Sequence, residues 1–394
     1  MRRFVPFLIV LFAVAAVMRV NFFFTILYLF VALFLMSRFW TLRRVGQVRA
    51  QRHFVDRAFF GDQVAVDLVV QNSGWLPIPW VEVHESLPVD LITPPLQRQV
   101  ISLGPHESWK LNYTLRCRRR GYYRVGPLTL RSGDLLGLEP PSLRQVDPDY
   151  LIVYPQVAPL EQLGLPTHSP LAALPARSPL FEDPSRVVGV RDYVYGDSPR
   201  RIHWTATASA GRLLVKQYQP AIARETMICL DLDEAGYEAR YRYTATELAI
   251  VVAASVANHI VTHDKLPVGL ATEAQDPLLD DRARFSLPPR AERSYLMSLL
   301  EVLARAQVVK DAPFTDLLRR ESVRLAWGAT LLVITGRESA GLFDTLLYLR
   351  RAGFTVALAL VQPGRPSPEL RQRADQLNLP VHRVWRQQDL ETWR

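Results

Sequence analysis

The chain has 394 residues and a formal net charge of +9, and only four of its 47 basic residues are lysines, so almost all of its positive charge is guanidinium. A chain of this length can form two or three domains, each with its own core. The charge indicates an anionic partner, such as nucleic acid or lipid, without choosing between them. Cys117 and Cys229 are the only cysteines. Their separation excludes a cysteine metal site and a disulfide framework, and fits a reducing compartment.

Two apolar runs, residues 4–18 and 22–36, open the sequence. As a helix, each run would cover about 22 Å at 1.5 Å per residue, against a hydrocarbon core of about 30 Å. Two short spans in a hairpin over residues 1–40 fit this pattern better than one long helix. The alternative is a signal peptide, but no small-residue cleavage site follows the first run, and the second run would then be unexplained.

Arginines flank this predicted hairpin unevenly. Two arginines lie before the first apolar run and five closely follow the second run, whereas Arg19 stands alone between the runs. Positive charge concentrates on the cytoplasmic side of membrane proteins. We therefore expect a two-span protein of the cell membrane, in contact with the lipid bilayer, with both termini and all soluble domains in the cytoplasm.

Residues 41–155 are predicted to form an antiparallel β-sandwich, because short segments of alternating apolar and polar residues are separated by turn residues. The expected strands are 64–72, 79–87, 108–117, 122–132 and 150–155. Arg118, Arg119 and Arg120 precede a Gly-Tyr-Tyr turn within this domain. We interpret them as a solvated basic loop and expect no nucleic-acid binding, because the nearby aromatic residues occupy strand-core positions rather than stacking positions.

Residues 156–188 are rich in proline and are expected to form a linker or a strap. From 223 to 394, apolar strands alternate with amphipathic helices, which predicts a mostly parallel, doubly wound α/β sheet covered on both faces. The expected strands are 225–232, 267–271, 330–335, 354–361 and 381–385. A ligand site in such a sheet lies at the carboxyl ends of the strands.

The first of these strands ends at Asp231 and Asp233, whose carboxylates could hold a hard cation such as Mg²⁺. The same pattern begins the active site of haloacid-dehalogenase-like phosphatases, with Thr335 at a later strand end. No lysine follows Lys310, however, and Asp280 and Asp281 precede Thr335, which is the wrong order for that family. Weak Mg²⁺ binding and a phosphatase-like hydrolase remain as alternatives.

His259 and His263 have the i, i+4 spacing of a two-histidine zinc face, but the metalloprotease glutamate and a third ligand are missing. The sequence also contains no P-loop and no G-x-S-x-G motif. We therefore predict a non-enzymatic protein that has no nucleotide site or resident cofactor of its own.

Residues 189–222 combine arginine, aromatic and acidic residues in a short segment. Ser198 is predicted to cap a helix over residues 200–210, with Pro199 in its first turn and Gly211 as its end. Asp192 and Asp197 are the expected partners of Arg200 and Arg201, and Ile202 and Trp204 are expected to anchor the helix on the α/β domain. The segment can serve as a structural strap or as an interaction surface, because tryptophan, tyrosine and arginine dominate binding hot spots.

This segment closely resembles the signature of the bacterial family named domain of unknown function 58. The candidate interaction residues are the matching positions Arg191, Tyr193, Gly196, Asp197, Arg200, Arg201, Ile202, Trp204 and Lys216, and Ala208 and Leu214 also match the signature. Residues 120–138 resemble the second hallmark of the family, with Leu135 at a position where proline is usual. The apolar amino terminus also fits, so the resemblance covers nearly the whole chain.

The resemblance implies a last domain like a von Willebrand factor A domain and a role as membrane-bound partner or assembly factor of a MoxR-type AAA+ ATPase. The metal-ion-dependent adhesion site of such domains uses D-x-S-x-S, a threonine and a later aspartate. Asp231 matches, Asp233 and Ala235 replace the serines, and Gly336 stands where the later aspartate is expected. The expectation is therefore a non-enzymatic, membrane-anchored interaction or assembly protein. Its rivals are a metal-dependent hydrolase and a protein that binds nucleic acid or another anionic surface.

Overall fold

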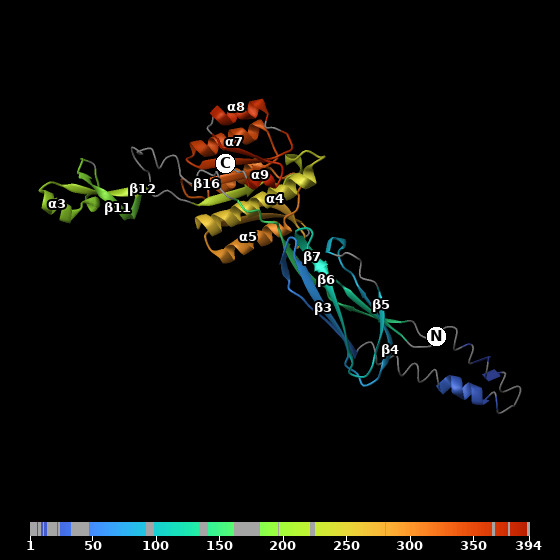
Figure 1. Ribbon diagram of the computed structural model, residues 1–394. Helices are drawn as coiled ribbons and strands as arrows, with labels where there is room; N and C mark the ends of the chain where they lie inside the picture. The colour runs from blue at the N-terminus through green and yellow to red at the C-terminus, as the bar shows by residue number, and fades with distance from the viewer. Residues whose placement is uncertain are drawn as a thin grey trace. The chain divides into compact units, whose positions relative to one another are not determined.

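The computed structural model describes residues 47–91, 98–133, 141–160, 182–195, 197–220, 225–279, 281–364, 367–376 and 379–391, together with residues 6, 9–10, 12–13, 22 and 24–32 of the amino terminus. The chain divides into two compact units, Met1–Pro155 and Gln156–Arg394. The labelled elements of both units can be followed in Figure 1.

The predicted hairpin over residues 1–40 lies largely outside the described residues, and the positions described within it are helical. In the described part of the chain, one helical stretch, Arg242–Asp264, is long and apolar enough to cross a membrane. Its most apolar window is 72% buried within the protein. That stretch covers the α/β sheet, so its apolar composition reflects a position in a protein core.

The described residues of the first unit form ten β-strands in three small sheets. The strands are β1 (Val48–His53), β2 (Arg57–Phe59), β3 (Gln63–Asn72), β4 (Ile78–Glu85), β5 (Gln99–Leu103), β6 (Ser108–Arg116), β7 (Gly121–Val125), β8 (Leu128–Ser132), β9 (Ser142–Val146) and β10 (Asp149–Tyr154), with a short 3₁₀ helix η2 (Val89–Leu91). The sheet orders are β1-β3-β6, β2-β10-β7 and β5-β4-β8-β9. All neighbours are antiparallel except β2 and β10. The unit is β-rich, as the alternation of apolar residues predicted.

The single strand predicted over residues 122–132 is wrong. The chain forms two strands there, β7 and β8, which belong to different sheets. The break falls at Gly126-Pro127, where proline has no N–H to continue a ladder. The short strands β1, β2, β5 and β9 were not predicted.

A buried arginine joins the three sheets of this unit. Arg52 of β1 pairs with Glu85 of β4 and Asp149 of β10, and Glu85 also accepts a hydrogen bond from the hydroxyl of Tyr113 at 2.6 Å. The side chains of Arg52 and Glu85 are almost completely buried. A Cβ atom at Gly126 would lie 2.5 Å from Arg52 Nη2. Gly126, which lies in the segment that resembles the second family hallmark, therefore leaves room for the guanidinium of Arg52.

The second unit begins with a separate β-hairpin, which we call the signature hairpin (residues 182–220). It consists of β11 (Glu182–Asp192), a 3₁₀ turn η4 (Pro199–Arg201), α3 (Trp204–Ala210) and β12 (Leu214–Pro220), and the two strands are antiparallel. The predicted proline linker over 156–188 differs at its end, because β11 already begins at Glu182. Residues 161–181 of that prediction lie outside the described residues.

The rest of this unit is a six-stranded sheet covered by helices. The strands are β13 (Thr226–Leu230), β14 (Val268–Asp276), β15 (Asp281–Arg290), β16 (Thr330–Thr335), β17 (Thr355–Val361) and β18 (Val381–Val384). The helical elements are η5 (Glu234–Gly236), α4 (Arg242–His259), η6 (Ile260–Asp264), α5 (Arg293–Arg305), α6 (Phe314–Ser322), α7 (Ala340–Arg351), α8 (Pro368–Gln376) and α9 (Gln388–Glu391). The strand order is β15-β14-β13-β16-β17-β18.

Every neighbouring pair in this sheet is parallel except β14 and β15. The edge strand β15 was not predicted, because its charged residues and its Pro288-Pro289 pair are typical of a loop. Proline is tolerated there because an edge strand leaves one row of N–H groups unpaired.

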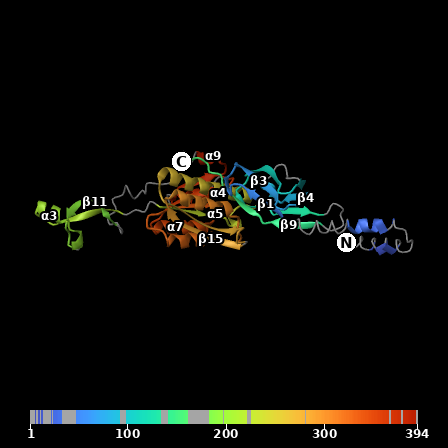
Figure 2. The same cartoon turned by 90° about the horizontal axis from the view of Figure 1, so that it is seen from below.

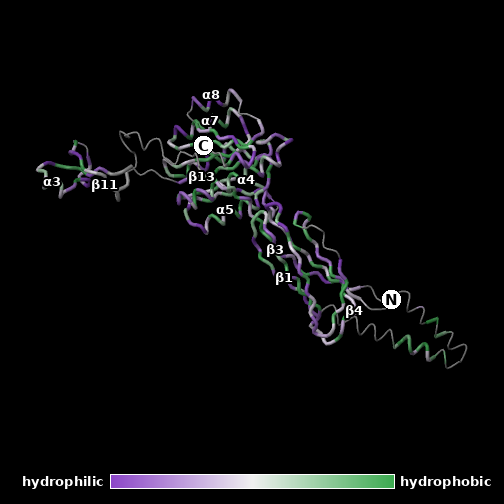
Figure 3. Tube along the Cα trace, in the orientation of Figure 1, coloured by the Kyte–Doolittle hydropathy of each residue, from purple (hydrophilic) through white to green (hydrophobic). Residues whose placement is uncertain are grey.

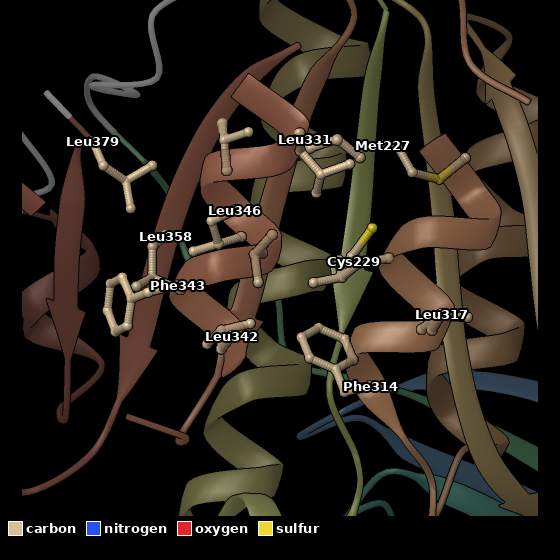
Figure 4. Close-up of a cluster of buried hydrophobic side chains, with 14 of the residues drawn as sticks. Met227, Cys229, Phe314, Leu317, Leu331, Leu342, Phe343, Leu346, Leu358 and Leu379 are labelled. Atoms are coloured by element: carbon tan, nitrogen blue, oxygen red, sulfur yellow. The ribbon is translucent and has the colours of Figure 1, made fainter. Parts of the chain in front are cut away.

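Helices cover both faces of the sheet. Figures 1 and 2 show α4 on one side of the sheet and α7 on the other. Alternate residues of β13 serve the two faces, and the face under α6 and α7 holds Met227 and Cys229 in one cluster with Phe314, Leu342 and Leu358 (Figure 4). In Figure 3 the interior of this domain is mainly hydrophobic, whereas α8 at its periphery is mainly hydrophilic. This packing fixes the carboxyl ends of the strands at one edge.

We predict that Arg52→Met destabilises the first unit by about 3–5 kcal/mol, because it leaves Glu85 as an uncompensated buried charge. The double variant Arg52→Met, Glu85→Met should recover most of that loss. Scanning calorimetry of the purified full-length protein would measure both effects. Arg49→Met, at an exposed position of the same strand, is the matched control and should change little. Equal unfolding temperatures for Arg52→Met and Arg49→Met would contradict the prediction.

Candidate functional site

The order of the strands places a switch point between β13 and β16. The chain leaves β13 for its neighbour β14 on one side and later returns to form β16 on the other side. Ligand sites of open α/β sheets lie at the carboxyl ends of strands at such a point. Asp231 and Asp233 follow β13, and Thr335 and Arg337 lie at the end of β16, so all four come from this edge.

The carboxylate of Asp231 is buried and is held by protein donors. Its Oδ2 accepts a hydrogen bond from Thr335 Oγ1 at 2.7 Å, and its Oδ1 accepts one from the backbone N–H of Asp233 at 3.1 Å. Arg337 Nε lies 3.6 Å from Asp231 Oδ2, which forms an ion pair. Both carboxylate oxygens of Asp231 are therefore engaged by the protein.

Asp233 is bound by the same arginine. Arg337 Nη2 donates to Asp233 Oδ2 at 2.7 Å, and Asp233 Oδ1 accepts from the N–H of Ala235 at 3.4 Å, where it caps η5. The backbone N–H of Arg337 in turn donates to Thr335 Oγ1 at 3.0 Å. Arg337 thus supplies the positive charge that two adjacent carboxylates require.

Two glycines leave room for the side chains of Asp231 and Tyr237 at this edge of the sheet. A Cβ at Gly236 would lie 2.8 Å from Asp231 Oδ2, and a Cβ at Gly336 would lie 2.5 Å from the Tyr237 ring. The Tyr237 hydroxyl donates to the backbone carbonyl of Asp231 at 2.6 Å. Gly336, at the position where the resemblance leads one to expect an aspartate, therefore makes room for Tyr237. Sequence reasoning missed both Tyr237 and Arg337, although the Gly-Arg-Glu run after β16 offered a signal.

Burial raises the pKa of Asp231 to about 6, although the hydrogen bond from Thr335 and the charge of Arg337 act in the opposite direction. Burial also raises the pKa of Tyr237 well above its ordinary value, so this phenol stays protonated and remains a donor. Asp231 is therefore ionised at neutral pH.

The residues at this edge do not fit a metal ion. A cation between Asp231 and Asp233 would have to displace Arg337, which already bonds Asp233 and lies beside Asp231. Within the described ranges, no group of three or more His, Cys, Asp or Glu side chains is arranged to hold a metal. An attacking carboxylate of the phosphatase kind would likewise need to lose its bonded partners. We therefore derive no metal-dependent step from Asp231 and Asp233.

His259 and His263, at zinc-like spacing, stack on each other instead of converging. Their ring centroids lie 4.7 Å apart with an interplanar angle of 18°. Burial lowers the pKa of His259. This pair is a packing contact at the end of α4, and it is not a metal centre.

In the signature hairpin, an arginine fork holds the turn. Arg191 donates from Nη1 and Nη2 to the two carboxylate oxygens of Asp197, each at 2.7 Å, and Asp197 also accepts from the N–H of Val194. These bonds lower the pKa of Asp197 to about 2. The other predicted carboxylate, Asp192, bonds Arg212 at 3.1 Å. Arg212 and Arg191 are thus the hydrogen-bond partners of these two carboxylates, and the charge of Arg201 also acts on Asp197.

The predicted helix over 200–210 is interrupted at Ile202, which is buried and bridges Val215 of β12. The 3₁₀ turn precedes this bridge and α3 follows it. His203 rather than Ser198 provides the side-chain cap, because its Nδ1 accepts from the N–H of Ala206. The helix ends at Gly211 as predicted, with a positive φ of 68°.

The remaining candidates divide into buried and exposed positions. Trp204 is 67% exposed and Tyr195 is fully exposed. Trp204 thus does not belong to the small core of the hairpin, and the expectation that Ile202 and Trp204 anchor the helix on the α/β domain stays a prediction. Arg200 and Arg201 are exposed, whereas Tyr193 and Lys216 are half-buried. Gly196 lies outside the described residues.

Comparison with known proteins identifies a family region and distant relatives. Residues 189–349 match the model of the family described as "Protein of unknown function DUF58". The chain is 24% identical over 312 residues to the "Uncharacterized protein YeaD" of Bacillus subtilis. The matched region covers 76% of this chain and 72% of that protein.

Solved structures show only a coarse similarity. A von Willebrand factor type A protein from Catenulispora acidiphila is 13% identical, covers 45% of this chain and 42% of its own, and has a TM-score of 0.30. A CARDB domain from Pyrococcus furiosus is 16% identical, covers 27% of this chain and 91% of its own, and has a TM-score of 0.20.

We predict that Arg337→Met lowers stability by about 2–4 kcal/mol, because two adjacent carboxylates lose their shared cation. Millimolar Mg²⁺ should raise the unfolding temperature of this variant and leave that of the wild type unchanged, since oxygen ligands are then free to accept a hard cation. Thermal unfolding with and without Mg²⁺ would measure this. Arg351→Met, on the exposed end of α7, is the control. Equal stabilisation of the wild type by Mg²⁺ would contradict the assigned role of Arg337.

Asp231 should also impose a pH dependence on stability. Its folded pKa of about 6 lies above the ordinary value of about 4, so the folded state binds more protons than the unfolded state between these values. The free energy of unfolding of the wild type, relative to Asp231→Asn, should therefore fall as pH rises from about 4 to about 6, by on the order of 3 kcal/mol, and then level off. Urea unfolding over this range measures the difference. A flat or rising difference would refute the assignment.

Proposed function

We propose, from the premise that the chain belongs to the DUF58 family through residues 189–349, that it is a membrane-anchored interaction or assembly protein without catalytic activity of its own. In this proposal its partner is a MoxR-type AAA+ ATPase, and the signature hairpin is the contact surface. The observation that carries the proposal is the exposure of aromatic and apolar side chains on a small hairpin whose turn is held by the Arg191–Asp197 hydrogen bonds.

The signature hairpin buries little of its own apolar surface. Ile202, Leu214 and Val215 are its buried hydrophobic residues in the described part of the chain. By contrast, the exposed large hydrophobic residues are Val187, Val190, Val194, Tyr195, Trp204 and Leu213. Exposed apolar surface is typical of interaction sites, and tryptophan and tyrosine are enriched at binding hot spots. The motif positions thus divide between a scaffold, which includes Arg191 and Asp197, and exposed side chains, which include Trp204.

Membrane anchoring is supported by the apolar amino terminus. Among its described residues, Ile9, Phe12, Phe22, Tyr28 and Leu29 are exposed large hydrophobic side chains. Such a surface is costly in water and stable in a bilayer. The arginine distribution favours two spans with both termini and the soluble domains in the cytoplasm.

The absence of a catalytic role is supported by the chemistry at the sheet edge. The two carboxylates that could serve a hydrolase are already bound by Thr335 and Arg337. The sequence contains no P-loop, so in this proposal energy comes from the partner. The MoxR-type ATPase is proposed because proteins of the family that this sequence resembles typically accompany such enzymes.

We predict that an AAA+ ATPase co-purifies with tagged full-length protein extracted from native membranes in mild detergent. Trp204→Ala should reduce its recovery by at least about tenfold, because truncation of a hot-spot residue costs about 2 kcal/mol or more. Quantitative mass spectrometry of the eluates would measure the recovery.

Trp75→Ala is the matched control, since Trp75 is also a largely exposed tryptophan and lies in the other unit. It should retain the ATPase, and circular dichroism should show that both variants are folded. Recovery with Trp204→Ala equal to that of the wild type would reject the hairpin as the contact surface. Absence of any AAA+ ATPase from all eluates would reject the proposed partner.

A further inference from the structure

A cavity of about 330 Å³ lies at the carboxyl edge of the α/β sheet, next to the carboxylates that Arg337 pairs with. Its described walls come from three parts of the chain: the stretch from η5 into α4, the loop after β16, and residues 361–364 and 367 after β17. The lining residues that matter for the argument are Tyr237, Glu238, Tyr241, Gly336, Glu338 and Gln362. The cavity lies at the low end of the size range of ligand pockets, which is about 300–1,000 Å³. It has room for one side chain or a small molecule.

The described lining of this cavity carries negative charge. Glu238 and Glu338 are both in the wall, and the described lining residues include no lysine or arginine. Glu338 accepts hydrogen bonds from the Gln362 side-chain amide and from the backbone N–H of Ser367. These donors are neutral, so they fix the position of the Glu338 carboxylate without cancelling its charge.

Among the described residues near this cavity, three arginines have other contacts. Arg337 bonds Asp233, and Arg383 donates to the backbone carbonyls of Gln362 and Pro363. Arg240 lies over the ring of Tyr241, with its guanidinium carbon 5.3 Å from the ring centroid. An entering cation would meet two carboxylates, Glu238 and Glu338, in the described lining.

The remaining lining suits a flat cation on an apolar stem. Tyr237 and Tyr241 provide aromatic surface, and the buried side chains of Ala245 and Val361 provide apolar surface. A guanidinium stacks on aromatic faces and forms forked hydrogen bonds with a carboxylate, whereas an ammonium is a compact, strongly hydrated charge. The contact of Arg240 with Tyr241 shows that this ring already accepts a guanidinium.

We propose that this cavity binds the side chain of an arginine presented by a partner polypeptide. The guanidinium pairs with Glu338 and Glu238, and its methylene stem lies against the tyrosines. The proposal is independent of the signature hairpin and of the nature of the ATPase. It gives the α/β domain a binding site that uses no metal. This site lies beside Asp231 and Asp233, which are paired with Arg337.

The test is saturation-transfer difference NMR, which detects weak binding, on the full-length protein in deuterated detergent. The probe is N-acetyl-arginine methylamide. The neutral isostere N-acetyl-citrulline methylamide and N-acetyl-lysine methylamide are the comparisons. The variants are Glu338→Gln and Glu238→Gln, singly and together, with Glu292→Gln as a control because Glu292 is an exposed carboxylate outside the cavity lining.

The expected result is saturation of the arginine side-chain protons in the wild type and in Glu292→Gln, a weaker effect with lysine and none with citrulline. The double variant should lose at least about nine-tenths of the effect, with an unchanged circular dichroism spectrum. Equal saturation of arginine and citrulline, or an undiminished arginine effect in the folded double variant, would overturn the proposal. If the double variant fails to fold, the single variants and the citrulline comparison decide the question by the same criteria.

Discussion

Two carboxylates at the end of a central buried strand require a cation, and Arg337 supplies it. Asp231 and Asp233 leave β13 side by side, and no arrangement of this edge is stable while both are ionised and unpaired. Because Arg337 comes from the end of the neighbouring strand β16, its bond with Asp233 also ties the two strands together. Gly236, Gly336 and Tyr237 are adjusted to this pair. These contacts make the edge a structural junction between two strands. The site that we propose for a ligand lies in the adjacent cavity.

The same logic recurs in the first unit. Arg52 joins the three small sheets through Glu85 and Asp149, and Gly126 leaves space for it. Burying a guanidinium and a carboxylate is costly, and the cost is offset only where each group is bonded on several sides. Sheets of three or four strands have small cores, so a shared ion pair that spans them defines how they pack. One hallmark motif of the chain is thus explained as packing.

The signature hairpin uses an arginine differently. The Arg191–Asp197 fork is exposed, so it contributes through geometry more than through energy, and it sets the shape of the turn. The core beneath it is too small to bury Trp204 or Tyr195. A scaffold that is fixed by hydrogen bonds and presents unburied aromatic side chains has the physical character of a contact surface. Together with the cavity at the sheet edge, the hairpin is one of two surfaces of the second unit that we propose as contacts for polypeptides.

By itself, the sequence determined the features that depend on local periodicity. Alternation of apolar residues indicated β3, β4 and β6, continuous apolar runs indicated β13, β16 and β17, and the strand ends placed Asp231 and Thr335 at one edge. Gly211 marked a helix end because few other residues accept its conformation. The tertiary structure alone decided which partners these residues have. Arg337 lies 104 positions from Asp233, the edge strand β15 forms only against β14, and Trp204 stays exposed because no neighbour covers it in the described chain. Local patterns specify a residue's own conformation, whereas charge pairing and burial depend on segments that are distant in sequence and meet only after folding.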